Sequence, residues 1–473
     1  MLAQRDAPIM AIATPPGRGA VGVVRLSGKQ LQAFGQQLCQ VPLKARHAHL
    51  VQLQDDQGQA IDQVLALYFP APHSYTGEDV LELQCHGGTV VLHMVLAHCL
   101  ALAQQTDHQG RACLPGLRMA QPGEFTQRAY LNQKIDLAQA EAVADVIDAH
   151  TEAAVRSAGR SLQGAFSKQV DGLKDALVHV RMQIEASLDF PEEDIDFIEQ
   201  LGVASQLTAL QTQLLALLAQ AEQGALLRDG LKVVIAGQPN AGKSSLLNAL
   251  AGAELAIVTP IAGTTRDVLG ESIQIEGVPI HVLDTAGLRD LSMADEVEQM
   301  GIGRAWAQIQ QADMVLLLND LSRAHDAVYQ TAQHHLRAQI EQAMPPRTHL
   351  LQVNNKADTL VSTEVAEQDE AVRISAKTGW GLPELRQRIL ALAGWSSQAQ
   401  EGVFTARTRH VQALRQVAQH VAVATAQLGH ASPALDLLAE ECRLAQLSLA
   451  SLTGDFSADD LLGEIFSRFC IGK

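Results

Sequence analysis

Short apolar runs separated by Gly- and Pro-containing segments characterise the beginning of the chain. Residues 21–26, 64–69 and 80–84 are rich in Val, Ile and Leu and predict strands. Residues 85–88, CHGG, predict a turn, and residues 90–104 predict a helix after it. We therefore expect a mixed α/β domain here.

From Lys134 onward the spacing of the apolar residues becomes helical. One apolar stripe recurs at intervals of three and four over residues 162–188, and a second covers residues 203–217. The first stripe predicts one long helix, which the acidic residues 191–196 interrupt before the second helix begins. Stripes of this kind are typical of helices that pack in a bundle.

The helical pattern is expected to stop near Gly224, and strands alternating with loops take over across residues 232–389. Within that stretch, residues 272–275 and 279–283 predict a hairpin that turns at Glu276-Gly277. An α/β domain is therefore predicted between two helical stretches.

Helical patterning resumes at Arg409, and Ser457 with Asp460 forms a capping box before the apolar residues 461–469. The economical interpretation is an α/β domain inserted into a helical domain whose halves pack on each other. The predicted chain is multidomain, with an N-terminal α+β domain at 1–133, a first helical part at 134–229, the inserted domain at 230–395 and a second helical part at 396–473.

The length and net charge of the chain limit its domain number and its binding partners. A chain of 473 residues is too long for one hydrophobic core. Its net charge of -17 argues against binding nucleic acid over the whole surface, because phosphate neutralisation supplies most of such affinity. An RNA contact would need a local basic patch or a basic partner. No pair of its 6 cysteines has C-x-x-C spacing, which favours reduced thiols in the cytoplasm over a zinc site.

Residues 237–244, GQPNAGKS, match the phosphate-binding loop G-x-x-x-x-G-K-S. They follow the apolar residues 231–236, as expected for a buried parallel strand, and precede a predicted helix at 245–250. Such a loop points backbone N–H groups at phosphates. Lys243 would add positive charge beside the β- and γ-phosphates, and the Ser244 hydroxyl would ligate Mg²⁺.

Two later segments predict the switches of a GTPase. Residues 263–267, GTTRD, offer Thr265 to Mg²⁺ and the γ-phosphate. Residues 284–287, DTAG, offer the Asp284 carboxylate to Mg²⁺ through water and the Gly287 N–H to the γ-phosphate. These contacts depend on the γ-phosphate, so they would distinguish GTP from GDP.

Residues 355–358, NKAD, follow a predicted strand at 349–353 and indicate a guanine pocket. The Asp358 carboxylate can accept hydrogen bonds from guanine N1–H and the exocyclic amine, whereas adenine would leave buried polar groups unpaired. Lys356 would pack over the ring, and residues 375–377, SAK, would complete the pocket. The order of the motifs predicts GTP rather than ATP.

The chain lacks the glutamine that orients the attacking water in Ras-like GTPases. Those proteins place a water-orienting Gln directly after D-x-x-G, and this chain has Leu288 there. A Leu side chain can neither orient water nor stabilise developing charge. Either another group takes over this role or the protein hydrolyses GTP poorly. Because an arginine finger contributes roughly 10³–10⁵ in rate, a replacement must supply a large electrostatic effect.

Further distinctive segments lie outside the nucleotide motifs. They are residues 13–19 (ATPPGRG), 76–80 (TGEDV), 122–126 (PGEFT) with 128–132 (RAYLN), 136–142 (DLAQAEA) and 469–473 (FCIGK). On these residues the chain resembles the MnmE (TrmE) family of tRNA-modification GTPases over essentially its full length.

The resemblance implies a Ras-like G domain that dimerises across its switches, with K⁺ near the place of an arginine finger. The implied K⁺ ligands are Asn240, Thr264 and backbone oxygens near Thr259 and Ile261. The implied catalytic acid is Glu298 rather than Glu296, because Glu298 precedes the Met300-Gly301 step as the family pattern requires.

The residues expected to contact the nucleotide lie in the motifs described above. Ser244 and Thr265 are the expected ligands of Mg²⁺, and Thr265 is also expected to take part in catalysis. The expected nucleotide contacts are Asn240, Ala241, Gly242, Lys243, Ser244, Ser245, Thr259, Pro260, Ile261, Ala262, Gly263, Thr264, Thr265, Asp284, Thr285, Ala286, Gly287, Asn355, Lys356, Ala357, Asp358, Ser375, Ala376 and Lys377.

The resemblance also implies an N-terminal domain like that of folate-dependent aminomethyltransferases, with 5-formyl- or 5,10-methylene-tetrahydrofolate as one-carbon donor. The implied folate contacts are Arg25, Glu82, Lys134 and Lys473. A Glu can pair with the donor edge of a pterin, and Arg and Lys can meet glutamate carboxylates. Cys470 is either a small packed residue or a thiol facing the one-carbon chemistry, and reactivity would require a low thiolate pKa.

The family builds an aminomethyl-type group on C5 of the wobble uridine of tRNA, together with a flavoprotein partner, MnmG (GidA), that carries the FAD. A homodimer that joins this partner in a larger complex, away from membranes, is therefore expected. Two alternatives remain. A ribosome-assembly GTPase is disfavoured by the -17 charge and by the lack of an appended RNA-binding module, and a folate-dependent aminomethyltransferase with a regulatory domain is the other.

Overall fold

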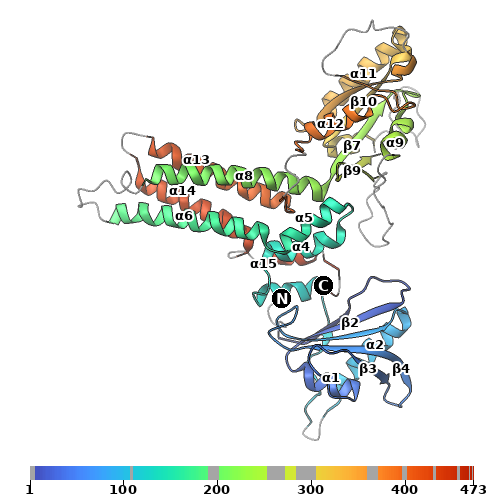
Figure 1. The fold of residues 1–473 in the computed structure, drawn as a ribbon, viewed down its shortest axis with the longest axis vertical. Coiled ribbons are helices and arrows are strands. Elements are labelled where there is room, and N and C mark those ends of the chain that lie inside the picture. Colours follow the sequence, from blue (N-terminus) through green and yellow to red (C-terminus); the bar gives the residue numbers. More distant parts are fainter. Residues whose placement is uncertain are drawn as a thin grey trace. The chain divides into compact units, whose positions relative to one another are not determined.

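The computed structural model of the chain describes residues 6–106, 110–189, 202–252, 272–283, 305–359, 371–396, 402–429, 433–454, 459–467, 469–470 and 472. It divides into two compact units (Figure 1). Unit 1 comprises Met1–Ala144 and Ala450–Lys473, and unit 2 comprises Asp145–Leu449. The four segments proposed from the sequence are a finer division, which stays a prediction.

Unit 1 is built on a 6-stranded sheet of order β3-β4-β5-β2-β1-β6. Its strands are β1 (Ile9–Ile12), β2 (Val21–Gly28), β3 (His49–Gln54), β4 (Ala60–Phe69), β5 (Asp79–His86) and β6 (Arg118–Met119). All neighbours are antiparallel except β1 and β6. The predicted turn at residues 85–88 is therefore wrong in part, because Cys85 and His86 continue β5 and pair with β2.

Helices α1 (Leu31–Cys39) and α2 (Thr89–Gln104) supply apolar side chains to the core of this sheet. Phe34 and Val95 are buried there against strand residues such as Leu83. The predicted helix at 90–104 is confirmed as α2. The burial of β5 alternates along most of its length, as expected for a strand with one face on a core.

The C-terminal segment returns to unit 1. Helix α15 (Asp459–Ser467) packs through Ile465 and Phe466 on Leu137 at the start of α4 (Leu137–Asp148). The Cys470 carbonyl accepts a hydrogen bond of 3.4 Å from the N–H of Gly123, which precedes α3 (Glu124–Leu131). Both ends of the chain thus belong to the same unit.

Unit 2 contains helices α5 (Glu152–Leu162), α6 (Ala165–Asp189), α8 (Val203–Asp229) and α13 (Thr408–Leu428), with most of α14 (Leu435–Thr453). Helices α6, α8, α13 and α14 run side by side, as Figure 1 shows. The single helix predicted over residues 162–188 is wrong at its beginning. Leu162 ends α5, and the chain turns at Gly164, whose φ is 82°, before α6 begins.

The prediction that helical structure stops near Gly224 is also wrong, because α8 continues to Asp229. A Cβ at position 224 would collide with the carbonyl oxygen of Phe404. Gly224 therefore permits the close approach of a distant backbone segment and does not end the helix.

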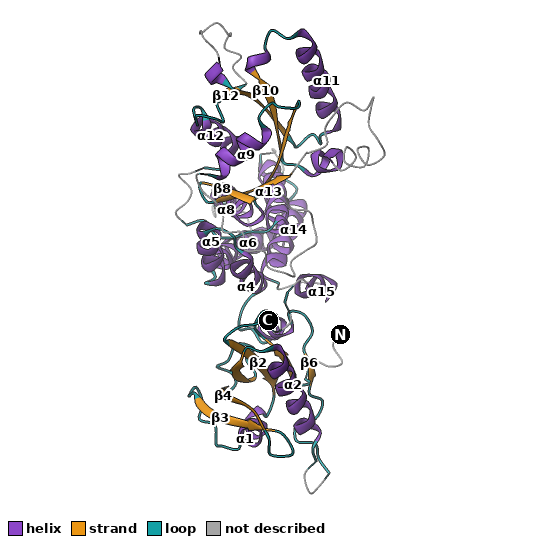
Figure 2. Ribbon diagram, turned by 90° about the vertical axis from the view of Figure 1, so that its right-hand side faces the viewer, coloured by secondary structure: helices purple, strands orange, loops and turns teal. Residues whose placement is uncertain are grey.

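A second sheet of 6 strands lies within unit 2, in the order β12-β11-β10-β7-β9-β8 (Figure 2). Its strands are β7 (Leu231–Gly237), β8 (Ser272–Ile275), β9 (Val278–Leu283), β10 (Met314–Asp320), β11 (His349–Asn355) and β12 (Val372–Arg373). Only β8 and β9 are antiparallel. The predicted hairpin is confirmed, and Glu276 and Gly277 at its turn have φ of 50° and 82°.

Helices α9 (Lys243–Ala251), α11 (Ala327–Ala343) and α12 (Leu382–Leu392) belong to this inserted α/β region. Separate apolar clusters cover opposite faces of the sheet, since neighbouring residues of β7, Val233 and Val234, contribute to different clusters. The alternation of strands and loops predicted for residues 232–389 is wrong at α11 and α12, where the chain is helical. Among the described residues, no helix combines the length and apolar character needed to cross a membrane.

The helices that precede and follow this α/β region in the chain, α8 and α13, are both tied to one buried carboxylate, that of Asp145. Asp145 of α4 accepts hydrogen bonds of 2.8 Å from Arg228, near the end of α8, and 2.8 Å from Arg407, which caps α13. The Asp145 side chain is 5% exposed. Thr151, before α5, also donates a hydrogen bond of 2.8 Å to the Gly277 carbonyl in the β8–β9 turn.

Replacing Asp145 by Asn should lower the free energy of unfolding of unit 2 by about 3 kcal/mol, because it removes the buried charged acceptor that the Arg228 and Arg407 guanidinium groups share. Urea unfolding followed by circular dichroism measures this loss. Asp229→Asn is the matched control, since Asp229 also pairs with Arg228 but is 42% exposed. Equal stabilities of the two variants would contradict the role of Asp145.

Candidate nucleotide-binding site

The loop between β7 and α9 has the backbone of a phosphate-binding loop. Gly237 has φ of 155°, and a Cβ there would lie 2.8 Å from the Leu318 carbonyl oxygen. Gly242 has φ of 97°, and a Cβ there would collide with Asn355 Nδ2. Neither position therefore accepts a side chain. The loop is closed on Lys243, whose Nζ donates to the carbonyl oxygens of Gly237 at 2.7 Å and Gln238 at 3.2 Å.

Helix α9 starts at the end of this loop. Its first intrahelical bond runs from Leu246 N–H to the Gly242 carbonyl, at 2.9 Å. The preceding N–H groups at the beginning of a helix have no intrahelical acceptor and favour anions. Ser244 and Ser245 are exposed there, and a hydroxyl oxygen is a ligand that Mg²⁺ accepts. The donor set therefore fits a phosphate with a hard cation beside it.

Asn355 at the end of β11 joins the phosphate loop to the base pocket. Its Nδ2 donates to the Ala241 carbonyl at 2.9 Å, and its Oδ1 accepts from Ala376 N–H at 3.0 Å. The residue is 2% exposed. One carboxamide thus holds two of the sequence-predicted segments at a defined separation.

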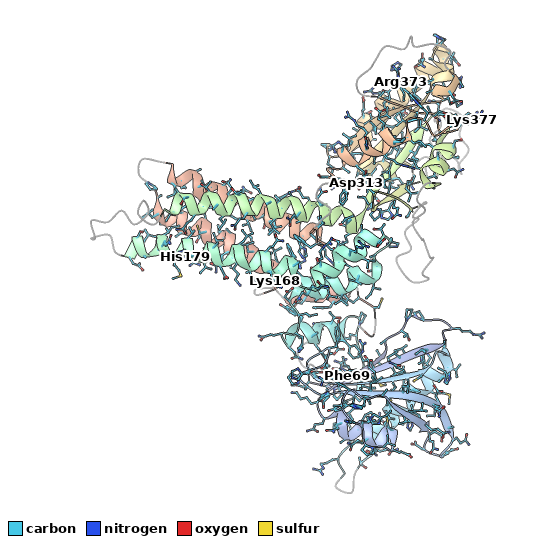
Figure 3. All side chains as sticks on the ribbon, viewed as in Figure 1. Phe69, Lys168, His179, Asp313, Arg373 and Lys377 are labelled. Atoms are coloured by element: carbon cyan, nitrogen blue, oxygen red, sulfur yellow. The ribbon has the colours of Figure 1, made fainter. Side chains whose placement is uncertain are left out.

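Asp358 stands on the short helix η4 (Ala357–Thr359), where its side chain is open to solvent. Its Oδ1 accepts a 2.6 Å hydrogen bond from Ser375 Oγ, and Ser375 is 1% exposed. This hydrogen bond from Ser375 holds the pKa of Asp358 below its ordinary value. The carboxylate is therefore ionised, oriented and able to accept further hydrogen bonds. Lys377 lies at the opposite end of the sheet from Asp313, as Figure 3 shows.

The sequence prediction missed Asp320, which contacts this pocket. Its Oδ2 accepts a 2.6 Å hydrogen bond from Nζ of Lys356. The overlooked signal was the apolar run at residues 314–318 before Asn319 and Asp320, which resembles the buried run that precedes the phosphate loop.

Several predicted site residues lie outside the described residues. These are Thr259, Pro260, Ile261, Ala262, Gly263, Thr264, Thr265, Asp284, Thr285, Ala286, Gly287, Glu296, Glu298 and Lys473. Asn240 is described; it is exposed at the tip of the phosphate loop, with φ of 64°.

In unit 1, Arg25 of β2 and Glu82 of β5 face each other across the antiparallel ladder. Arg25 Nε donates to Glu82 Oε1 at 2.8 Å, and Arg25 Nη1 donates to the Gly472 carbonyl at 3.3 Å. The guanidinium also lies 5.6 Å from the ring centre of Tyr75, which is 36% exposed. An ion pair, an aromatic ring and the C-terminal tail are thus brought together.

Lys134 contacts the loop that carries Tyr75. Its Nζ donates to the Pro72 carbonyl at 3.0 Å, and its side chain packs beside Gly77. Cys470 is exposed in the tail. Paired charges beside a ring suit a heteroaromatic ligand with carboxylates, so these residues fit a folate.

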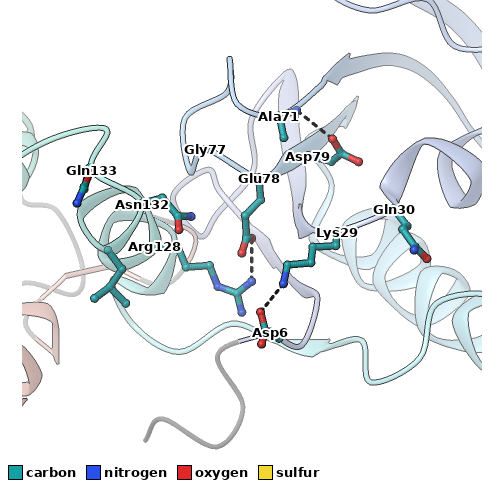
Figure 4. Close-up of a pocket in the computed structure, with 11 residues that line it drawn as sticks. Asp6, Lys29, Gln30, Ala71, Gly77, Glu78, Asp79, Arg128, Asn132 and Gln133 are labelled. Carbon is teal, nitrogen blue, oxygen red and sulfur yellow. Dashed lines mark hydrogen bonds and ion pairs between the residues drawn. The ribbon is translucent and has the colours of Figure 1, made fainter.

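A pocket of about 620 Å³ in unit 1 has a different lining (Figure 4). Four of its charged groups form two pairs, Glu78 with Arg128 at 2.9 Å and Lys29 with Asp6 at 2.7 Å, and Asp79 accepts from the Ala71 N–H at 3.0 Å. Neither Arg25 nor Glu82 lines it.

Two family models match the chain. The model of the MnmE helical domain matches residues 137–470, and the model of the GTP-binding protein TrmE N-terminus matches residues 8–134. The chain belongs to the MnmE family. The family membership predicted from the sequence is thereby confirmed, and with it the assignment to GTP-hydrolysing enzymes.

Curated relatives match along the whole chain. The tRNA modification GTPase MnmE of Methylibium petroleiphilum is 59% identical over 475 residues, covering 100% of both chains. That of Paracidovorax citrulli is 58% identical over 485 residues with the same coverage. That of Bordetella parapertussis is 54% identical over 467 residues and covers 99% of each chain.

Solved structures of Era also align with part of the chain. Aquifex aeolicus Era bound to GDP and AlF4⁻ is 25% identical, covers 40% of this chain and 66% of its own, and has a TM-score of 0.26. Era with MgGDPNP and a 16S ribosomal RNA segment is 26% identical over the same shares, with a TM-score of 0.27. The α/β fold of the inserted region is therefore assigned from its strand order, β12-β11-β10-β7-β9-β8, and not from these alignments.

Proposed function

We propose that this protein hydrolyses GTP to drive, with a flavoprotein partner of the MnmG type, the addition of a (carboxymethyl)aminomethyl group to C5 of the wobble uridine of tRNA. The observation that carries the proposal is family membership along the whole chain, including the parts outside the nucleotide motifs. For the same reason, a ribosome-assembly GTPase is disfavoured.

Guanine recognition would combine three groups on one edge of the sheet. The ionised Asp358 carboxylate accepts hydrogen bonds from the base, and Ser375 keeps it oriented. Asn355 maintains the distance between this pocket and the phosphate loop. Lys243 and the exposed Ser244 complete the phosphate end, where Ser244 and Thr265 would hold Mg²⁺.

Turnover would depend on residues of the switches. Glu298 would hold the proton that the attacking water loses, and Thr265 would close over the γ-phosphate. Asn240, Thr264 and backbone oxygens at Thr259 and Ile261 would hold K⁺, whose charge replaces that of an arginine finger. Two copies of the chain would complete this arrangement by pairing their G domains.

The one-carbon donor would bind in unit 1. Glu82 would accept hydrogen bonds from the pterin ring, and Arg25, Lys134 and Lys473 would meet its carboxylates. This assignment is supported by the Arg25–Glu82 pair and by the tail that reaches Arg25. Cys470, exposed in that tail, would face the one-carbon unit. FAD would be held only by the partner, and the complex would act on tRNA in the cytoplasm.

The wobble uridine tests this function directly. Expressed in a bacterium that lacks its own family member, the chain should restore C5-modified wobble uridines, as measured by mass spectrometry of tRNA nucleosides. Asp358→Asn should fail, because it loses the carboxylate that accepts from guanine, whereas Asp326→Asn, at a half-buried position that caps α11, should succeed. Unmodified uridines with the expressed, folded wild-type chain would refute the proposal.

Hydrolysis should be at least about tenfold faster in KCl than in NaCl, because the cation replaces part of an effect of roughly 10³–10⁵ in rate. Phosphate release from GTP at matched ionic strength measures this ratio. Glu298→Ala should abolish turnover and leave GDP affinity unchanged, whereas Glu296→Ala should retain turnover. Equal rates in the two salts would remove the potassium role, and inactivity of Glu296→Ala alone would reassign the acid.

Glu82→Gln should weaken binding of 5-formyl-tetrahydrofolate about tenfold, because it removes a charged acceptor and the partner of Arg25. Isothermal titration calorimetry on the whole protein measures the affinity. Glu185→Gln is the matched control, since Glu185 also pairs with an arginine, Arg181, at 2.8 Å, but lies in α6. Unchanged affinity in Glu82→Gln would exclude Glu82 as a ligand.

A further inference from the structure

Asp320 occupies the carboxyl end of β10, which lies between the phosphate-loop strand β7 and the base-pocket strand β11. In the parallel register, Asp320 stands opposite Asn355, the residue that joins the phosphate loop to the base pocket. Ligands of open α/β sheets bind at the carboxyl ends of the strands, so Asp320 is placed at the centre of the candidate site.

The two oxygens of the Asp320 carboxylate have different partners. Oδ1 accepts from Ser322 N–H at 3.0 Å and from Ser322 Oγ at 2.5 Å. Oδ2 accepts from Nζ of Lys356 at 2.6 Å, and the Asp320 side chain is only 3% exposed. The backbone N–H of Asp320 donates to Tyr329 Oη at 2.8 Å, which fixes the strand end itself. A carboxylate so buried and so held is a rigid anchor for one ammonium group.

Lys356 needs an anchor for two reasons. Its backbone is left-handed, with φ of 64°, which costs energy for a residue with a Cβ. Its side chain has several rotatable bonds and loses conformational entropy when it is ordered. The side chain is 34% exposed even with its ammonium bound to Asp320. Part of its length thus remains available to a flat ligand.

We propose that Asp320 is a positioning residue for guanine recognition, which holds the Lys356 ammonium so that the methylene stem of Lys356 forms one wall of the purine pocket. This inference rests on the proposed binding of GTP. Asp320 itself does not touch the base and acts only through Lys356. Its effect therefore falls on nucleotide affinity and not on the chemical step.

The ionisation of Asp320 agrees with this role. Burial alone opposes its charge, but the hydrogen bonds from Lys356 and Ser322 outweigh burial and hold the pKa of Asp320 below its ordinary value. The groups that face the carboxylate are Lys356 and Ser322, so it stays ionised at neutral pH.

The test is Asp320→Asn. The Asn carboxamide has nearly the shape of the carboxylate, but it offers no charge to Lys356 and presents a donor in place of one acceptor. Because a hydrogen bond between charged groups is stronger than a neutral one, we expect about a tenfold weaker affinity for fluorescent mant-GDP. KM for GTP should rise by about the same factor, and kcat should be unchanged. A fall in kcat at unchanged KM would overturn the proposal.

A double-mutant cycle separates this role from a general loss of structure. Lys356→Met keeps the stem and removes the ammonium, so Asp320→Asn should add less than a twofold effect in that background. An equal tenfold effect in both backgrounds would overturn the proposal. Asp326→Asn is the matched control; it keeps the helix cap at α11 and should bind mant-GDP as the wild type does.

Ser322→Ala provides a second route if Asp320→Asn does not fold. It removes the Oγ donor from the anchor at an exposed position, and it should weaken mant-GDP binding about twofold to threefold. Unchanged affinity in that case would overturn the proposal. Competition of GDP and ADP for the wild-type protein distinguishes a failure of the proposed guanine binding from a failure of the proposed role of Asp320. Equal competition would reject guanine binding itself, whereas preference for GDP with an unaffected Asp320→Asn variant would reject only the role of Asp320.

Discussion

The carboxamide of Asn355 is the contact on which the nucleotide site depends. It accepts from the base-pocket loop at Ala376 and donates to the phosphate loop at Ala241. A nucleotide is bound at its base and at its phosphates at the same time. The base-pocket loop and the phosphate loop must therefore keep a constant separation to bind it. Because Asn355 is buried, both of its hydrogen bonds are protected from competition with water.

The parallel sheet makes this contact available. β7, β10 and β11 are neighbours, and their carboxyl ends deliver Gly237, Asp320 and Asn355 to the same edge. Two charged side chains at this edge are held by hydrogen bonds: Lys356 donates to Asp320, and Asp358 accepts from Ser375. Rigid groups of this kind reduce the entropy lost when a ligand binds.

In the part of the chain that the structure describes, the helices of unit 2 contact the α/β region at the β8–β9 hairpin and not at the edge of the sheet that carries the nucleotide site. Thr151 binds the turn of the β8–β9 hairpin, and Asp145 ties together the helices through which the chain enters and leaves. In the sequence this hairpin lies between the two predicted switches. The hairpin is thus hydrogen-bonded to the residue that caps α5. In unit 1 the chain end that approaches Arg25 supplies contacts from residues far away in sequence.

The sequence by itself determined the features that short segments encode. The phosphate loop, the Glu276-Gly277 turn and helix α2 depend on local glycine placement or periodicity, and the structure has a loop, a turn and a helix at those positions. Tertiary structure alone decided the contacts between distant segments. The predicted end of a helix at Gly224 is wrong, because the glycine instead makes room for the backbone at Phe404, which is 180 positions away in the sequence. Asp320 meets Lys356 only because β10 lies beside β11. Pairings of this kind arise from sheet order and helix packing, and no local pattern records them.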